Sequence, residues 1–282
     1  MPSHAPTEDP LSRERAHLSE SRAALRTMRE DAEALDIRDV TAGWVSAEIL
    51  HHQIELRIKA LADLSHTPLF FGRLDYLHHE ADTTRFSIGR RHVHDAGGDP
   101  MVVDWRAPVS QPFYRASRKN PQDVALRRRF GYTAGELTAY EDEHLTDPAE
   151  ADTTSALLQA EIERPRVGPM RDIVATIQPE QDEIVRAGIG GTVCVQGAPG
   201  TGKTAVGLHR VAYLLFAHRE RLARTGTLVI GPNASFLNYI EQVLPALGEI
   251  GIKQATVDNM EMLDEGAFDD LADPEVTASA WR

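Results

Sequence analysis

The feature that most constrains this chain is the stretch GAPGTGKT at positions 197–204. It fits the pattern G-x-x-x-x-G-K-[ST], and it lies between the apolar run TVCVQ at 192–196 and a segment with helical apolar spacing at 203–218. Glycine lets such a loop turn its backbone N–H groups toward phosphate oxygens, and a helix N-terminus adds partial positive charge. The sequence therefore predicts a strand, a loop and a helix that together bind the phosphates of a nucleoside triphosphate.

The same pattern assigns roles to single side chains. Lys203 is expected to reach the β- and γ-phosphates of ATP, and the Thr204 hydroxyl is expected to ligate Mg²⁺, so these two are the predicted catalytic residues and Thr204 the metal ligand. Upstream, Gln178 and Gln181 flank a helix start at Pro179. An amide offers adenine both a donor and an acceptor, although surface glutamines are common. The predicted nucleotide-binding residues are Gln178, Gln181, Gly197, Ala198, Pro199, Gly200, Thr201, Gly202, Lys203 and Thr204.

After the loop, a second apolar run, TLVIG at 227–231, has no polar alternation, which is typical of a parallel strand covered on both faces. With the loop and its helix it makes one βαβ unit of an α/β fold. A further helix is expected at about 234–247. Residues 258–282 carry eight acids before a single terminal arginine and predict a loose acidic tail. Within it, the segment 260–265 is interpreted as tail because Glu261 interrupts its apolar run.

The N-terminal region, residues 11–65, has the spacing of two helices. Apolar residues recur every seven positions in two series, Leu11, Leu18, Leu25 and Ala32, then Val40, Ala47, Ile54 and Leu61. A break at about 36–43 between the series predicts an antiparallel helical hairpin. Two alternatives stay open: an arm that projects from the molecule, or two amphipathic helices packed on a domain.

The next region is rich in β-branched and aromatic residues and in turn formers. We expect three or four short antiparallel strands from Pro68 to Tyr114, and a further pair within 123–140 that turns near 133–135. A short helix at 152–164 and a linker at 165–169 follow. The predicted domains are 1–65, a helical hairpin; 66–170, a mixed β-rich region; 171–257, the first half of a nucleotide-binding domain; and 258–282, the acidic tail.

Composition limits location and partners. The chain is 41% hydrophobic and 26% charged, and no apolar run approaches the roughly 20 residues that a membrane span needs. The N-terminus lacks the order of an export signal, and the single Cys194 allows neither an internal disulfide nor a cysteine zinc site. These features predict a cytoplasmic protein without a membrane partner. A net charge of −13 argues against attraction of the whole surface to nucleic acid, but it permits a local basic groove.

Several smaller groups of residues have a functional and a structural interpretation. A basic concentration predicts either a contact with nucleic-acid phosphate or with an acidic protein surface, or a plain charged face; its members are Arg115, Arg118, Lys119, Arg127, Arg128 and Arg129. A group of possible metal ligands is interpreted as a solvated strand edge; it consists of His78, His79, Glu80, His92 and His94. Asp36 and Asp39 at the hairpin tip either approach a metal ion or solvate a helix end. Trp105 is expected in the core.

Longer segments of the chain resemble a known family. The resemblance lies in FFGRLDY (70–76), IGRRHV (88–93), VVDWRAPVSQPFYRA (102–116), RDIVATIQPEQDEIVR (171–186) and the loop run. They are similar to the helicase D (HelD-like) branch of the UvrD/Rep type of superfamily 1 helicases. QPEQ at 178–181 looks like the Q motif, the loop like motif I, and LVIGPNASFLNYIEQVLPALGE at 228–249 like motif Ia.

This resemblance implies a fold and a set of partners. The fold class is α/β: an antiparallel helical hairpin, a small antiparallel β region, then the start of a RecA-like doubly wound parallel sheet that is truncated here. Gln181 takes the place of the adenine-reading glutamine, and Gln178 stands where related motors often have Asn. Residues 1–65 correspond in position to the arm with which the family enters the secondary channel of RNA polymerase. The family uses ATP to release polymerase from DNA, so DNA is a further possible partner.

One departure from the family pattern changes the expectation for catalysis. The acidic Walker B pair, the sensing Gln, the arginines that face the γ-phosphate and a second RecA-like domain are expected downstream of Arg282. An arginine finger alone is worth roughly 10³ to 10⁵ in rate, so we expect ATP binding with little or no turnover. Three hypotheses follow: the N-terminal part of a helicase-like motor that binds RNA polymerase; a polymerase-binding module that does not hydrolyse ATP; or an unrelated P-loop enzyme such as a small-molecule kinase. The last is weakened because no lid or substrate-binding segment follows the loop.

Overall fold

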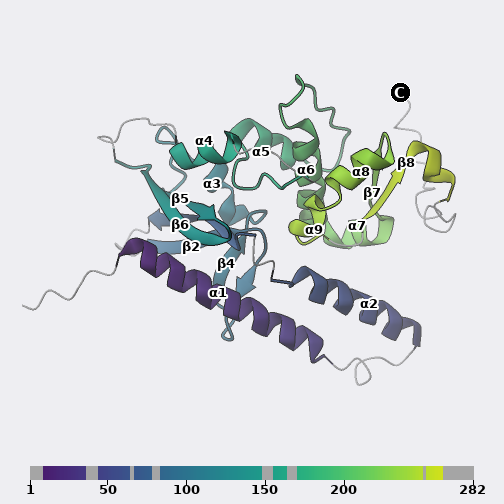
Figure 1. The fold of residues 1–282 in the computed structure, drawn as a ribbon, viewed down its shortest axis with the longest axis horizontal. Coiled ribbons are helices and arrows are strands. Elements are labelled where there is room, and N and C mark those ends of the chain that lie inside the picture. Colours follow the sequence, from purple (N-terminus) through teal and green to yellow (C-terminus); the bar gives the residue numbers. More distant parts are fainter. Residues whose placement is uncertain are drawn as a thin grey trace, which may run out of the picture. The chain divides into compact units, whose positions relative to one another are not determined.

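The computed structural model describes residues 9–35, 44–63, 67–77, 83–147, 155–163, 170–249 and 252–262 (Figure 1). The chain forms two units, Met1–Pro165 with Ile173–Asp182, and Arg166–Asp172 with Glu183–Arg282. The elements are α1 (Pro10–Glu33), α2 (Trp44–Ala60), β1 (Phe70–Leu77), β2 (Thr83–Gly89), β3 (Val93–His94), β4 (Pro100–Asp104), η2 (Pro108–Ser110), α3 (Pro112–Arg115), β5 (Val124–Thr133), β6 (Glu136–His144), α4 (Ala156–Glu163), α5 (Pro179–Val185), α6 (Lys203–Ala217), α7 (Arg219–Thr225), β7 (Leu228–Gly231), α8 (Ala234–Ile240), α9 (Val243–Ala246), β8 (Lys253–Thr256) and η3 (Val257–Met262).

Helix α1 begins where the sequence supplies a cap and lies along the sheet of the first unit. The Asp9 carboxylate accepts a hydrogen bond from the N–H of Leu11, and Pro10 occupies the first helical position, where it costs no backbone bond. The seven-residue apolar series of α1 is buried in one cluster with residues of the sheet; its members include Leu18, Leu25, Ala32, Phe70, Val93 and Phe130. The apolar seam of α1 therefore faces the sheet, as in the packed alternative, and α1 does not project.

Helix α2 is held differently, by its C-terminal end. Leu61, just beyond α2, is buried in the same cluster as Leu25, whereas the side chains from Gln53 to Ala60 are exposed or half-buried. Arg91 donates hydrogen bonds to the carbonyl oxygens of Ala60 and Ala62, where a cation stabilises a helix end. The predicted turn, with Asp36 and Asp39, lies outside the described residues.

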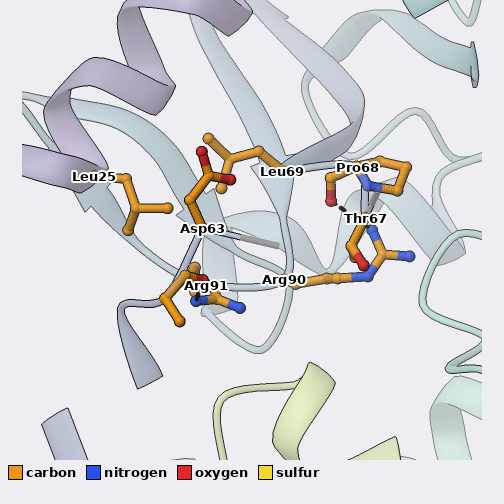
Figure 2. Close-up of a pocket in the computed structure, with 8 residues that line it drawn as sticks. Leu25, Asp63, Thr67, Pro68, Leu69, Arg90 and Arg91 are labelled. Atoms are coloured by element: carbon orange, nitrogen blue, oxygen red, sulfur yellow. Dashed lines mark hydrogen bonds between the residues drawn. The ribbon is translucent and has the colours of Figure 1, made fainter. Parts of the chain in front are cut away.

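Figure 2 shows the small cavity beside this end of α2. Arg90 reaches along the cavity and donates to the carbonyl oxygen of Pro68 (2.8 Å), and Asp63 forms an ion pair with Arg22 of α1. The cavity holds about 10 Å³, room for about one water molecule. The cavity lies where α1, the end of α2 and the sheet meet, and it is too small to be a ligand site.

The sheet of the first unit has the order β3-β4-β2-β1-β5-β6. The pairs are antiparallel except β2 and β4, which are parallel, with Ile88 opposite Val103. The expected all-antiparallel region was therefore wrong at this pair, because the chain reverses once into the two-residue β3 and again before β4. The turn predicted near 133–135 is confirmed: Ala134 and Gly135 both have positive φ (52° and 87°), as a tight hairpin turn requires.

The opposite face of this sheet is covered by the segment after β4. A Cβ on Gly72 would lie 2.1 Å from Phe113 Cε2, so the close approach of the Phe113 ring requires glycine in β1. Trp105 is fully buried, which confirms its expected place in the core. The Tyr114 hydroxyl donates to the carbonyl oxygen of Val174 (2.9 Å), which ties the segment after α4 to this face.

The second unit differs from its expected strands. Among its described residues β7 and β8 pair in parallel, with Ile230 opposite Ala255, but Thr192–Gln196 forms no strand and is mostly exposed. The prediction of a strand there was wrong for this structure: among the described residues no strand pairs with this apolar run, so its backbone groups join no ladder.

Three further boundaries in the second unit differ. The expected helix at 234–247 is divided into α8 and α9, because Pro245 cannot donate to the carbonyl of Glu241. The strand β8 was not predicted, since its four residues, KQAT, carry almost no apolar pattern. The start of the expected tail forms η3, and 263–282 lies outside the described residues. In the described part of the chain, no helix has the length and apolar character to cross a bilayer.

Candidate nucleotide-binding site

The loop at 197–204 has a backbone that depends on its glycines. Gly200 and Gly202 have φ of +83° and +82°, the left-handed region that side chains with a Cβ rarely adopt. A Cβ on Gly197 would lie 2.8 Å from the hydroxyl oxygen of Thr201. Each predicted glycine is therefore required for the curl of this loop, at two positions by its φ and at one by close approach.

The Lys203 side chain folds back over this loop. Its Nζ donates to the carbonyl oxygens of Gly197 (2.8 Å) and Ala198 (2.7 Å), and the Thr201 hydroxyl also donates to the Ala198 carbonyl (2.8 Å). The ammonium group therefore lies at the curl, where an incoming anion would meet it. Pro199 is exposed on the loop, and Thr204 is exposed in the first turn of α6.

The N-terminus of α6 supplies the other half of an anion site. The first bond within the helix joins the Val206 N–H to the Gly202 carbonyl oxygen (2.9 Å), so the N–H groups of Lys203, Thr204 and Ala205 precede the ladder. Gly202, the N-cap, has no side chain with which to accept from them. Free first-turn N–H groups, the helix dipole and one ammonium are the donor set that phosphate oxygens bind, so these residues fit a nucleotide phosphate.

Helix α6 is fixed in its unit by apolar burial and by one arginine. His209 is fully buried, and its Nδ1 is 2.7 Å from the Ala205 carbonyl oxygen. Arg210 donates to the carbonyl oxygens of Ile184 (3.1 Å), Ala187 and Gly188 (2.9 Å) at the C-terminal end of α5. Sequence reasoning missed Arg210, because a single cation on an amphipathic helix gives no sign of the carbonyls that it will meet.

The two predicted adenine-reading glutamines lie in the first unit, and the loop lies in the second. The structure places the two glutamines next to each other within the first unit, and the loop residues next to one another within the second. Gln181 accepts a hydrogen bond at its Oε1 from the Gln178 N–H (3.0 Å), which is the reciprocal half of a capping box at the start of α5. Gln178 donates through its amide to the Thr176 carbonyl oxygen (3.0 Å). Both side chains therefore have a structural role at this helix end.

Most of the arginines at 115–129 form ion pairs with carboxylates of the same unit. Arg115 Nε donates to the buried Asp182 (2.5 Å). On β5, Arg127 binds Glu143 at 2.9 and 2.7 Å, and it also donates to two backbone carbonyls. These guanidinium groups are compensated within the protein, so the cluster does not form one basic face for nucleic acid.

The other two arginines of β5 are also held within the fold. Arg129 lies over the Phe113 ring at 4.9 Å, and burial lowers its pKa to about 10, with Arg127 adding repulsion. Burial alone would lower the pKa of Arg128, but hydrogen bonds and attraction from Asp142 and Glu14 outweigh it and raise that pKa. Within the described residues, Lys119 is the exposed member of the cluster.

The candidate metal ligands do not form a site in the part of the chain that the structure describes. His92 and His94 have ring centroids 5.9 Å apart, and His94 Nδ1 lies 2.8 Å from the Asp95 carbonyl oxygen. No group of three or more His, Cys, Asp or Glu residues suited to a metal occurs among the described residues. His78, His79 and Glu80 lie outside them.

The fold therefore defines a mixed α/β protein in which an N-terminal helix covers a mixed sheet, followed by a loop that opens a helix. A family model described as the DNA helicase IV HelD N-terminal domain matches residues 11–156, just over half of the chain. The chain belongs to this family. The matched segment runs from the first turn of α1 to the first residue of α4. A search of characterised proteins finds no match to the chain.

Proposed function

We propose that this chain is the ATP- and Mg²⁺-binding N-terminal part of a helicase-like motor of the UvrD/Rep superfamily. Membership of the HelD family supports the motor class. The observation that carries the nucleotide is the Lys203 ammonium held at the curl of a glycine loop at the head of α6. The parallel pair β7 and β8, which follows α6 and α7, supports a RecA-like sheet for the second unit.

In this proposal the loop residues bind and orient the triphosphate. Lys203 exchanges its two carbonyl acceptors for β- and γ-phosphate oxygens, and the first-turn N–H groups of α6 donate to the same charge. The exposed Thr204 hydroxyl ligates Mg²⁺. When bound, ATP supplies the phosphoanhydride bond whose cleavage drives the motor. Gln181 and Gln178 recognise adenine; the capping bond fixes the Gln181 amide and leaves its N–H₂ and one lone pair for the base.

The partner in this proposal is core RNA polymerase, which the motor remodels or releases from DNA in the cytoplasm. Residues 1–65 supply the contact. Because α1 is embedded on the sheet and α2 is anchored at its C-terminal end, the arm that reaches the polymerase is α2 together with residues 36–43. Co-elution of the chain with core polymerase tests this part, and a chain that elutes alone at micromolar concentration contradicts it.

Calorimetry with ATP and Mg²⁺ tests the nucleotide site. Lys203→Ala removes the ammonium, and we expect at least about tenfold weaker binding, the scale of one charge-assisted hydrogen bond. Lys253→Ala is the matched control, since it removes the same charge from an exposed position on β8 and should bind as the unchanged chain does. Equal binding by both variants, or no heat from the unchanged chain, would reject the site.

A second candidate function is a polymerase-binding module whose nucleotide site binds without turnover. The unpaired state of Thr192–Gln196, directly before the loop, favours it, because catalysis needs groups held rigidly around the developing charge. Phosphate release by the same purified chain separates the two. Several turnovers per second that Lys203→Ala abolishes would exclude the module, whereas binding without release would exclude hydrolysis by this chain alone.

A further inference from the structure

A second anion site lies in the first unit, between the first turns of α1 and the sheet. It is a hollow of about 200 Å³ lined by Pro10, Arg13, Glu14, Arg73, Arg85 and Arg128. Four guanidinium groups and one carboxylate line it, in a chain whose net charge is −13.

The register of the sheet produces this convergence. Arg73 on β1 lies opposite Arg128 on β5, and Asp75, two residues along the same face, lies opposite Arg85 on β2. Side chains two apart on a strand point to one face, and here that face is the one under α1. Three neighbouring strands and one helix therefore each deliver arginine to one place, although the residues are far apart in sequence.

The carboxylates described around the hollow bind mainly two of its arginines, Arg73 and Arg128. Glu14 accepts from Arg73 and from Arg128 (2.7 Å), Asp142 binds Arg128 (2.5 and 2.6 Å), and Asp75 binds Arg73 (2.6 and 2.9 Å). Arg85 has a longer ion pair, 3.4 Å from Nε to Asp75, and its side chain is 59% exposed. Arg85 therefore keeps donor capacity at the mouth of the hollow.

We propose that this hollow binds a terminal phosphate group, a phosphate monoester. Planar guanidinium groups bind phosphate oxygens through paired N–H donors, and a phosphate monoester brings up to two negative charges to the four arginines that converge here. Pockets that enclose a whole small-molecule ligand measure roughly 300–1,000 Å³. The hollow is smaller, so it accepts the phosphate group of a ligand and leaves the rest of that ligand outside. This site is separate from the loop at 197–204 and does not depend on the proposed function.

The test is a titration in a Lys203→Ala background, which weakens phosphate binding at the loop. The probes are inorganic phosphate and a short single-stranded oligonucleotide with either a 5′-phosphate or a 5′-hydroxyl end. Arg85→Gln is the test variant, and Arg26→Gln is its matched control: Arg26 is 58% exposed, has a long ion pair with Asp63 (3.9 Å) and lies outside the hollow. Both variants lose one charge from an exposed side chain, so both should fold.

We expect Arg85→Gln to bind phosphate-bearing probes about tenfold more weakly than Arg26→Gln, the effect of one charge-assisted contact at a half-exposed group. Binding of inorganic phosphate indicates a small free ligand, and binding confined to the 5′-phosphorylated oligonucleotide indicates a nucleic-acid end; both support the site. Absence of phosphate binding, or equal binding by the two variants, overturns it. Equal Arg85-dependent binding of the 5′-hydroxyl oligonucleotide also overturns it, in favour of a backbone-contacting surface.

Discussion

The two units of this chain treat their apolar and charged side chains in different ways. In the first, Leu25 is 1% exposed between α1 and the sheet, and even charged groups such as Glu14 are buried in ion pairs. In the second, Ile230 of β7 is 48% exposed and the apolar run Thr192–Gln196 forms no strand. The first unit buries its apolar residues and several of its charged groups, whereas the second leaves apolar strand surface in water.

This difference has a physical origin and a consequence. The first unit has a six-stranded sheet with α1 on one face and the segment around Phe113 on the other, so most inward side chains meet a partner. The described sheet of the second unit has β7 and β8 alone. Two strands cannot bury both faces of a sheet without further layers. We therefore expect the second unit to open locally at lower free energy than the first.

The largest expected effect compares one buried and one exposed apolar residue. Leu25→Ala should lower the free energy of unfolding of the first unit by about 3 kcal/mol, because it leaves a cavity between α1 and the sheet. Ile230→Ala should change the second unit by less than about 0.5 kcal/mol, since its side chain is half in water. Hydrogen exchange of β1 and of β7 in each variant measures both. A similar loss from both substitutions would break the comparison.

A smaller effect is expected at the buried charge of the first unit. Glu14→Gln should cost about 2 kcal/mol, because Arg73 and Arg128 keep their charges and lose the carboxylate between them. Glu20→Gln, on an exposed position of the same helix, is the control and should cost less than about 0.5 kcal/mol. Urea unfolding of the two variants decides; an unchanged midpoint for Glu14→Gln would mean that solvent compensates the arginines.

The smallest effect is a pH dependence within the first unit. Burial, with a contribution from Asp123, raises the pKa of Tyr76 to about 12, from 10 in an unfolded chain, and its hydroxyl donates to the Val109 carbonyl oxygen (2.7 Å). Between these values the folded chain keeps a proton that the unfolded chain loses, so stability falls as pH rises from 10 to 12. Below pH 10 this contribution is fully present.

Tyr76→Phe isolates that contribution. The variant loses the hydroxyl, so its unfolding midpoint should fall less between pH 10 and 12 than that of the unchanged chain. Urea titrations at three pH values in this window measure the difference, and other groups cancel because both chains carry them. Parallel curves for the two chains would show that the Tyr76 hydroxyl is as well solvated in the folded state as in the unfolded one.

Much of the first unit could be predicted from local pattern. The seven-residue spacing of Leu18, Leu25 and Ala32 identified a helix with one apolar seam, and the Asp9-Pro10 pair is a helix start that local chemistry explains. The sequence did not show which surface this apolar seam packs against. The same spacing serves a partner helix or a sheet, and the choice depends on the apolar face that Phe70, Val93 and Phe130 jointly present.

The candidate site shows the same division. The glycines and Lys203 of the loop were identified by spacing alone, because the curl of a glycine loop depends on backbone φ at neighbouring residues. Arg128, in contrast, was grouped with its sequence neighbours as one basic patch, while its carboxylate partners, Glu14 and Asp142, lie in other elements. The arginine hollow had no sequence sign, since its four cations come from α1, β1, β2 and β5.

The sequence by itself determined which segments turn, cap or curl, and it determined the loop at Gly197–Thr204, since those choices depend on φ and on neighbours a few residues away. The tertiary structure alone decided that α1 lies on a sheet, that β2 and β4 run parallel and that Thr192–Gln196 forms no strand. The physical reason is that strand pairing, burial and charge compensation are properties of two surfaces together. The residues of one surface therefore do not determine which other surface it packs against or pairs with.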